Sequence, residues 1–145
     1  MSNAQTPPPT TPYGAPISLA LARAAIAAAE AEAQANGWAV AICVVDSGGN
    51  LVAMARLDNT QLSGTRIAEH KARTAVEFRR PTKVLEDAVG GGGIGLRVLT
   101  FGASVADGGV PIIVGGAIVG GIGVSGAAGH EDGRVAQAGA RAVAG

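Results

Sequence analysis

The chain has 145 residues, of which 48% are hydrophobic, 15% charged and 3% aromatic, and its 11 basic residues balance its 11 acidic ones. This length suits one domain that buries roughly 68–70% of the surface of its unfolded chain. The balance of charge excludes a typical nucleic-acid binder, because such proteins carry a basic surplus and stacking aromatic side chains. A neutral surface and an Ala/Gly-rich composition also predict a homo-oligomer, in which self-association covers apolar surface.

The single cysteine, Cys43, excludes an internal disulfide framework and a multi-cysteine metal site, and its apolar surroundings predict a buried thiol. No apolar stretch is long enough to cross a membrane, and the N-terminus lacks a basic residue followed by an apolar signal region. We therefore expect a cytoplasmic protein with no membrane partner.

The N-terminal residues 1–16 are rich in Pro and Thr, which predicts a disordered or extended tail in front of a single domain at residues 17–145. Ser18 is expected to cap an Ala-rich helix over residues 19–35. Asn36-Gly37 favours the end of that helix, since these residues adopt a left-handed conformation readily.

The rest of the chain alternates hairpins and helices. The predicted elements are strands at 38–45 and 51–57, a helix at 62–79, a short helix at 83–89 capped by Thr82, strands at 111–114 and 117–124, and a helix at 131–143. The stretch 96–106 shows no clear preference. The order α-β-β-α-α-β-β-α predicts an α/β (α+β) domain in which helices pack on a largely antiparallel sheet.

Residues Gly121 to Gly126 match the G-x-G-x-x-G pattern of dinucleotide-binding loops. Such a unit also needs a second parallel strand and an acidic residue about 20 residues further on, and too little chain follows. We interpret the glycines as positions of close backbone packing. The N–H groups after Ser125 stay a candidate cradle for a carboxylate.

Lys71 shares a helical face with Ile67 and Ala75, and this face is expected to pack on the sheet. A charge on a packed face is costly unless it is paired. Its ammonium group therefore either reaches out to solvent or lines a pocket and meets an anion there. Thr74 would add a hydroxyl group beside it.

The two histidines are each open to two interpretations. His70 lies in a polar stripe typical of a solvated surface, and His130 precedes the last helix, where Glu131 suits the positive helix end. Their spacing does not indicate a zinc site, but one histidine suffices as an axial ligand of heme iron. Arg56, at the end of a strand, is a candidate clamp for a carboxylate.

Three ordered motifs, VVDSGGNLVAMARLD, IAEHKARTAVEFRRPT and GGVPIIVGGAIVGGIGVSG, together resemble the GlcG/HbpS family over about residues 17–143. This family includes the C-terminal domain of PduO-type proteins. The resemblance implies a profilin-like antiparallel sheet flanked by helices and assembled into homo-oligomers. For some members it implies binding of heme or its degradation products, and for others a small pathway protein encoded beside catabolic enzymes.

Two functions follow as expectations. The first is a small-ligand-binding protein of a catabolic pathway that takes heme as cofactor, with His70 or His130 on the iron. Its candidate ligand-binding residues are Arg56, Lys71, Thr74, Ser125, His130 and Glu131, with Arg79 and Arg80 as further cations. The alternative is a cofactor-independent tautomerase or isomerase acting on a small carboxylate or enol acid, in which Lys71 or His70 is the catalytic residue that transfers the proton.

Overall fold

The computed structural model describes residues 6–145, so the first five residues of the expected tail lie outside it. The helices and strands follow the predicted order, with one 3₁₀ helix added. They are α1 (Leu19–Ala35), β1 (Ala41–Asp46), β2 (Leu51–Arg56), α2 (Gly64–Phe78), α3 (Thr82–Gly90), the 3₁₀ helix η1 (Gly93–Thr100), β3 (Gly109–Val114), β4 (Ala117–Ser125) and α4 (Gly129–Val143).

The four strands form one antiparallel sheet in the order β2-β1-β4-β3. The two predicted hairpins, β1–β2 and β3–β4, are joined through the pairing of β1 with β4. This arrangement confirms the predicted α+β architecture. Among residues 6–145, the strands of this sheet pair in antiparallel fashion, unlike those of a dinucleotide-binding unit.

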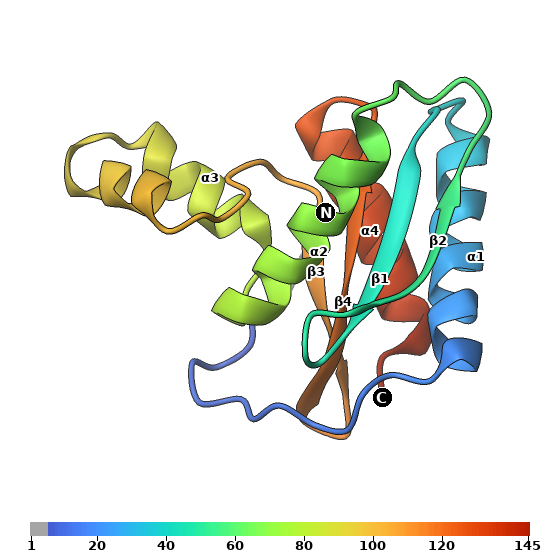
Figure 1. Ribbon diagram of the computed structural model, residues 1–145, viewed down its shortest axis with the longest axis horizontal. Coiled ribbons are helices and arrows are strands. Elements are labelled where there is room, and N and C mark those ends of the chain that lie inside the picture. The colour runs from blue at the N-terminus through green and yellow to red at the C-terminus, as the bar shows by residue number, and fades with distance from the viewer. Residues whose placement is uncertain (1–5) are drawn as a thin grey trace.

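Helices cover both faces of the sheet (Figure 1). Helix α2 packs on one face, mainly over β4, while α1 and α4 pack together on the other. The main core lies between the sheet and the α1–α4 pair. Helices α3 and η1 form an arm, residues 82–100, that projects from the body of the domain (Figure 1).

Helix α1 begins and ends as the sequence predicts. The Oγ of Ser18 accepts a hydrogen bond from the backbone N–H of Leu21 at 3.1 Å, and Gly37 follows the helix with a φ of 72°. The face of α1 toward the core carries Ala25 and Ala29, both fully buried. Alanine at these positions lets the helix approach its neighbours closely.

The contact between α2 and β4 depends on glycine. A Cβ atom added at Gly121 would lie 2.7 Å from the carbonyl oxygen of Ala72, and one added at Gly123 would overlap the carbonyl oxygen of Ala68. The helix backbone therefore lies directly on the strand. This geometry confirms close packing as the role of these glycines.

The described part of the tail forms a turn at residues 8–11, where the N–H of Thr11 donates to the carbonyl of Pro8 at 2.9 Å, and then runs along one end of β4. The N–H of Gly14 donates to the Ile118 carbonyl at 2.8 Å, and the N–H of Ile17 donates to the Val119 carbonyl at 2.9 Å. Arg79, after α2, donates to the Thr11 carbonyl at 2.8 Å. The segment thus fastens one end of β4 to the end of α2.

Some local expectations differ from the structure. Thr82 does not cap α3 with its side chain: it is the first residue of the helix, and its Oγ1 accepts from the N–H of Gly109 at 2.9 Å. The stretch without a clear preference contributes to η1. The thiol of Cys43 is fully buried as predicted, and burial together with the negative charge of Glu69 raises its pKa to about 12.

Candidate functional site

Lys71 is buried in the middle of α2 and forms an ion pair across the domain. Its Nζ donates to the carbonyl of Val124 at 2.9 Å and to Oδ2 of Asp132 at 3.1 Å. The side chains of the two charged residues are each 3% exposed. The ammonium group therefore points inward, and its anion comes from the segment 129–132 of the protein itself.

Asp132 lies in the first turn of α4, where it contacts both Lys71 of α2 and the backbone of the loop before α4. Its Oδ1 accepts from the N–H of Ala127 at 2.9 Å while Oδ2 faces Lys71. Burial raises the pKa of this carboxyl group, and the Lys71 ammonium and backbone N–H groups act in the opposite direction. A Cβ atom at Gly108 would lie only 2.8 Å from Nζ of Lys71, so the pair is tightly enclosed.

A second buried carboxylate, Asp107, lies at the same end of α4. A Cβ atom at Gly133 would lie 2.5 Å from its Oδ1, and its own N–H donates to Oε1 of Glu86 at 3.0 Å. Burial, followed by the charge of Glu86, raises the pKa of Asp107. Sequence reasoning assigned neither acid to the site, since neither belongs to a spaced motif, although it placed Lys71 near the Gly-His-Glu-Asp segment that contains Asp132.

Within residues 6–145, no group of three or more His, Cys, Asp or Glu side chains could hold a metal ion.

The other predicted ligand-binding residues occupy separate positions. Thr74 is buried near Lys71, but its Oγ1 accepts from the N–H of Ser104 at 2.9 Å. Arg56 and Ser125 share a row of the sheet, because both pair with Ala41 of β1. Ser125 is buried in that row, whereas Arg56 is exposed.

The first turn of α4 carries His130 and Glu131. Oε1 of Glu131 accepts from the N–H of Ala128 at 3.0 Å, which satisfies a free donor at the start of the helix. His130 is exposed. The structure thus brings Lys71, Asp132 and this turn together, while Arg56 lies outside the group.

Arg56 instead lines a shallow cleft of about 440 Å³ together with Trp38 and Asp58. The other two arginines proposed as cations, Arg79 and Arg80, already contact groups of the chain away from Lys71. The guanidinium group of Arg79 lies 4.7 Å from the ring centre of Tyr13, and Nε of Arg80 donates to the Phe78 carbonyl at 2.8 Å.

His70 lies on the side of α2 that faces the arm. Its Nε2 is 2.8 Å from the carbonyl oxygen of Gly102, just after η1, and the ring is partly buried. A carbonyl can only accept a hydrogen bond, so this contact makes Nε2 the donor and leaves the lone pair of Nδ1 free in the neutral ring. Phe101 stacks on Phe78 with 6.2 Å between the ring centres, and 52% of Phe101 is exposed.

The sheet order, the helices on both faces and the glycine contact of α2 define a small α+β domain built on a single antiparallel sheet. A family model described as haem-degrading protein HbpS-like matches residues 17–141. The chain therefore belongs to the HbpS-like family.

Individual relatives agree with this assignment. GlcG of Escherichia coli K12 is 42% identical over 90 residues, which cover 62% of this chain and 66% of GlcG, just under two thirds of its length. The crystal structure of HbpS superposes with a TM-score of 0.81 and 34% identity, covering 91% of this chain and 93% of HbpS. That of a PduOC–heme complex superposes with a TM-score of 0.78 and 28% identity, covering 88% and 94% of the two chains.

No helix in the described part of the chain is both long and apolar enough to span a bilayer.

Proposed function

We propose that this GlcG/HbpS-like protein is a small-ligand-binding protein that takes heme, with His70 as an axial ligand of the iron. The observation that carries the proposal is the contact between His70 and Gly102. Histidines that bind metals commonly donate their other ring N–H to a carbonyl group, which orients the ring. The 2.8 Å contact from Nε2 to the Gly102 carbonyl supplies such a support and leaves Nδ1 for the iron.

The surroundings of His70 fit the remaining needs of heme, which are an apolar wall and cations for its propionates. The half-exposed ring of Phe101 adjoins Gly102 and offers apolar surface. Arg66 is exposed one turn before His70 on α2, so it shares that helical face. The similarity to the PduOC–heme complex supports the same ligand class.

His130 is the less suitable of the two histidines. It is exposed at the start of α4, and no hydrogen-bond partner among residues 6–145 fixes its ring. The positive end of a helix also disfavours added cationic charge. These features make His130 a matched control for His70.

Hemin titration followed by absorption spectroscopy tests the proposal. The wild-type protein is expected to give a sharp Soret band. We expect His70→Ala to weaken hemin binding at least tenfold and to change the band, while His130→Ala keeps both. Binding that is lost equally in the two variants, or kept in His70→Ala, would contradict the assignment of the ligand.

The alternative isomerase activity through Lys71 or His70 stays a prediction, and so do the link to a catabolic pathway and the cytoplasmic location. No contact of Lys71 favours proton transfer to a substrate, because its ammonium group is enclosed by Asp132, Val124 and Gly108.

A further inference from the structure

We propose that the cleft beside Trp38 is a second ligand site, which binds a small zwitterion: an α-amino acid with an apolar side chain. Arg56 binds the carboxylate of this ligand, Asp58 its ammonium group and Trp38 its side chain. The proposal rests on two opposite charges without partners, an aromatic ring held in place and the negative end of a helix. None of the described residues that line the cleft is a histidine, so the proposal does not depend on heme.

The cleft lies where α1 ends and the first two strands of the sheet begin and finish. Gln34 belongs to the last turn of α1, Gly37 and Trp38 lead from this helix toward β1, and residues 56–58 come from the end of β2 and the turn after it. Its volume is about 440 Å³. Sites for small molecules have volumes of roughly 300–1,000 Å³, so this cleft suits a ligand at the small end of that class.

Arg56 and Asp58 carry opposite charges that nothing in the described chain neutralises. Both residues are exposed, and neither side chain has an ion pair or a hydrogen bond within residues 6–145. They do not pair with each other, although a single residue separates them. A ligand with both a carboxylate and an ammonium group engages both side chains, because a guanidinium group binds a carboxylate through two parallel hydrogen bonds and a carboxylate accepts from an ammonium group.

The spacing of these two residues limits how far apart the charges of the ligand can be. The Cα atoms of residues two positions apart are separated by at most about 7 Å. In an α-amino acid the carboxylate and the ammonium group are attached to the same carbon atom, so both can meet their partners at one place in the cleft. This spacing favours an α-amino acid over a ligand with distant charges.

The aromatic wall of the cleft is fixed by contacts within the chain. The ring of Trp38 is partly buried against the main core, and the guanidinium group of Arg134 lies 5.3 Å from its centre. Nη2 of Arg134 is itself held by Oε2 of Glu32 at 2.7 Å. An indole ring offers a large apolar surface, and little side-chain freedom is lost on binding when that ring is already in place. The wall therefore favours an apolar side chain on the ligand.

The end of α1 adds negative potential beside Asp58. A helix carries partial negative charge at its carbonyl end, which attracts cations. The last turn of α1 contains no basic residue to offset this charge, and Gln34 in that turn lines the cleft. Asp58 and the helix end thus favour the ammonium group of the ligand, while Arg56 favours its carboxylate.

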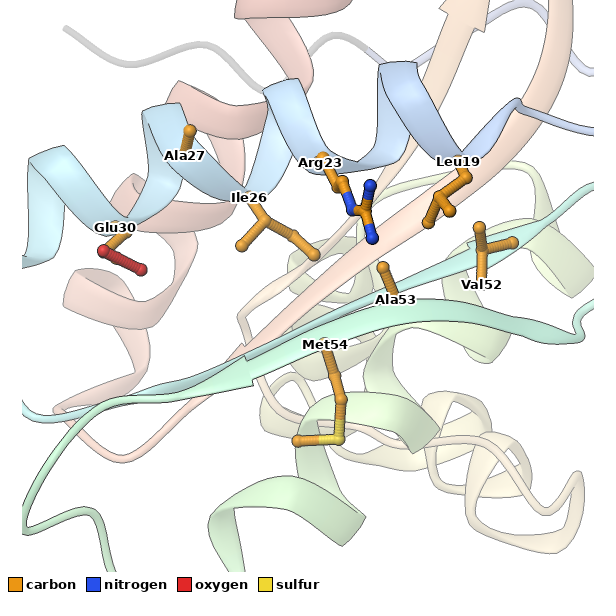
Figure 2. Close-up of a pocket in the computed structure, with 8 residues that line it drawn as sticks. All are labelled: Leu19, Arg23, Ile26, Ala27, Glu30, Val52, Ala53 and Met54. Carbon is orange, nitrogen blue, oxygen red and sulfur yellow. The ribbon is translucent and has the colours of Figure 1, made fainter.

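A neighbouring groove of about 570 Å³ between α1 and β2 lacks this combination (Figure 2). Arg23 projects from the helix toward the strand beside aliphatic side chains such as Ile26, and no aromatic residue lines the groove (Figure 2). Its acid, Glu30, is seven residues further along the helix, which corresponds to about 10 Å. Arg23 has no ion-pair partner among the described residues either. It is therefore a matched control for Arg56.

Tryptophan fluorescence tests the proposal directly, because Trp38 is the single tryptophan of the chain. We expect L-phenylalanine to change its emission saturably, and isothermal titration calorimetry to give the same affinity. Arg56→Gln and Asp58→Asn should each weaken this binding by about tenfold or more, since each removes a hydrogen bond between charged groups. Arg23→Gln should bind L-phenylalanine like the wild type. His70→Ala should do so too, which separates this proposal from that of the heme ligand.

Two probes with a single charge test the class of ligand. Phenylpropanoate lacks the ammonium group and phenethylamine lacks the carboxylate, so the wild type should bind both less tightly than L-phenylalanine. Asp58→Asn should lose the preference over phenylpropanoate, and Arg56→Gln the preference over phenethylamine. Absence of binding at millimolar L-phenylalanine by both methods, or equal binding of the three probes by the wild type, would overturn the proposal. An equal loss of affinity in Arg23→Gln would do so as well.

Discussion

Lys71 and Asp132 connect two elements that are far apart in the chain. A buried ion pair contributes little net stability when it replaces apolar residues, but the loss of one partner is costly because the other charge stays buried. The pair therefore fixes the position of the start of α4 against α2. It acts as a structural clamp beside the arm, and the neighbouring Asp107 adds a second buried carboxylate at the same helix end.

The first prediction follows from this clamp. Lys71→Met keeps the aliphatic stem but leaves Asp132 without its cation, so we expect the free energy of unfolding to fall by about 3–5 kcal/mol. Urea unfolding at pH 7 measures the change. Lys71→Met/Asp132→Leu, which removes both charges, should recover most of the loss.

The pH dependence of the same variant gives a second readout. Burial raises the pKa of Asp132, so the folded state favours its protonated form, and Lys71 opposes this effect. Without Lys71 the deficit should be smallest below the ordinary pKa of 3.8 and should grow as pH rises through the raised value. A deficit that is independent of pH, or unchanged in the double variant, would show that lost packing rather than unpaired charge causes it.

Sequence reasoning identified Lys71 but not Asp132 as its partner. Helical periodicity places Lys71 on the face of α2 that packs, because that relation is local. The identity of its partner depends on how α4 closes over the sheet, 61 residues away. For the same reason, no local sequence pattern could predict that Arg56 lines a cleft that Lys71 does not reach.

At the scale of elements, the strands and most helices could be predicted because their signals are local: caps, β-branched runs and tight turns. Ser18, Gly37 and the two-residue gap between the strands predicted at 111–114 and 117–124 mark boundaries that the structure confirms. The 3₁₀ helix η1 could not be predicted, since a glycine-rich stretch has little preference of its own. It packs against α3, and the two residues that follow its end, Phe101 and Gly102, contact α2.

The glycine contact between α2 and β4 gives the second prediction. Gly123→Ala places a methyl group against the backbone of Ala68, and the backbone cannot yield as a side chain would. We expect a loss of about 3 kcal/mol or more in unfolding free energy, at or above the usual range for overpacking.

Gly90→Ala is the matched control for this substitution. An added Cβ there meets no atom within 4 Å, and the residue is helical. Its effect on urea unfolding should be neutral or slightly stabilising. If Gly123→Ala were tolerated as well as Gly90→Ala, α2 would not lie on the strand as closely as the structure indicates.

At the scale of the whole molecule, the domain has a well-packed body and a loosely attached arm. The core of the body contains fully buried side chains such as Ile42, Ile112 and Ile122, whereas Ile94 and Leu99 of the arm are 77% and 57% exposed. The arm meets the body through Thr82 and Glu86, which accept from the N–H groups of Gly109 and Asp107. Just after the arm, Phe101 stacks on Phe78 and Gly102 contacts His70. The proposed heme site thus lies at the junction between the loosely packed arm and helix α2 of the well-packed body.

The last prediction concerns how stability is distributed between these parts. Hydrogen exchange followed by mass spectrometry should show the amides of residues 83–100 exchanging about 100-fold or more faster than those of β1 and β4, because few buried apolar contacts hold the arm closed. Hemin should slow exchange in the arm of the wild-type protein but not of His70→Ala. An arm that exchanges as slowly as β1 would show that it unfolds only with the whole domain, and an equal response in His70→Ala would place the ligand away from the junction of α2 with the arm.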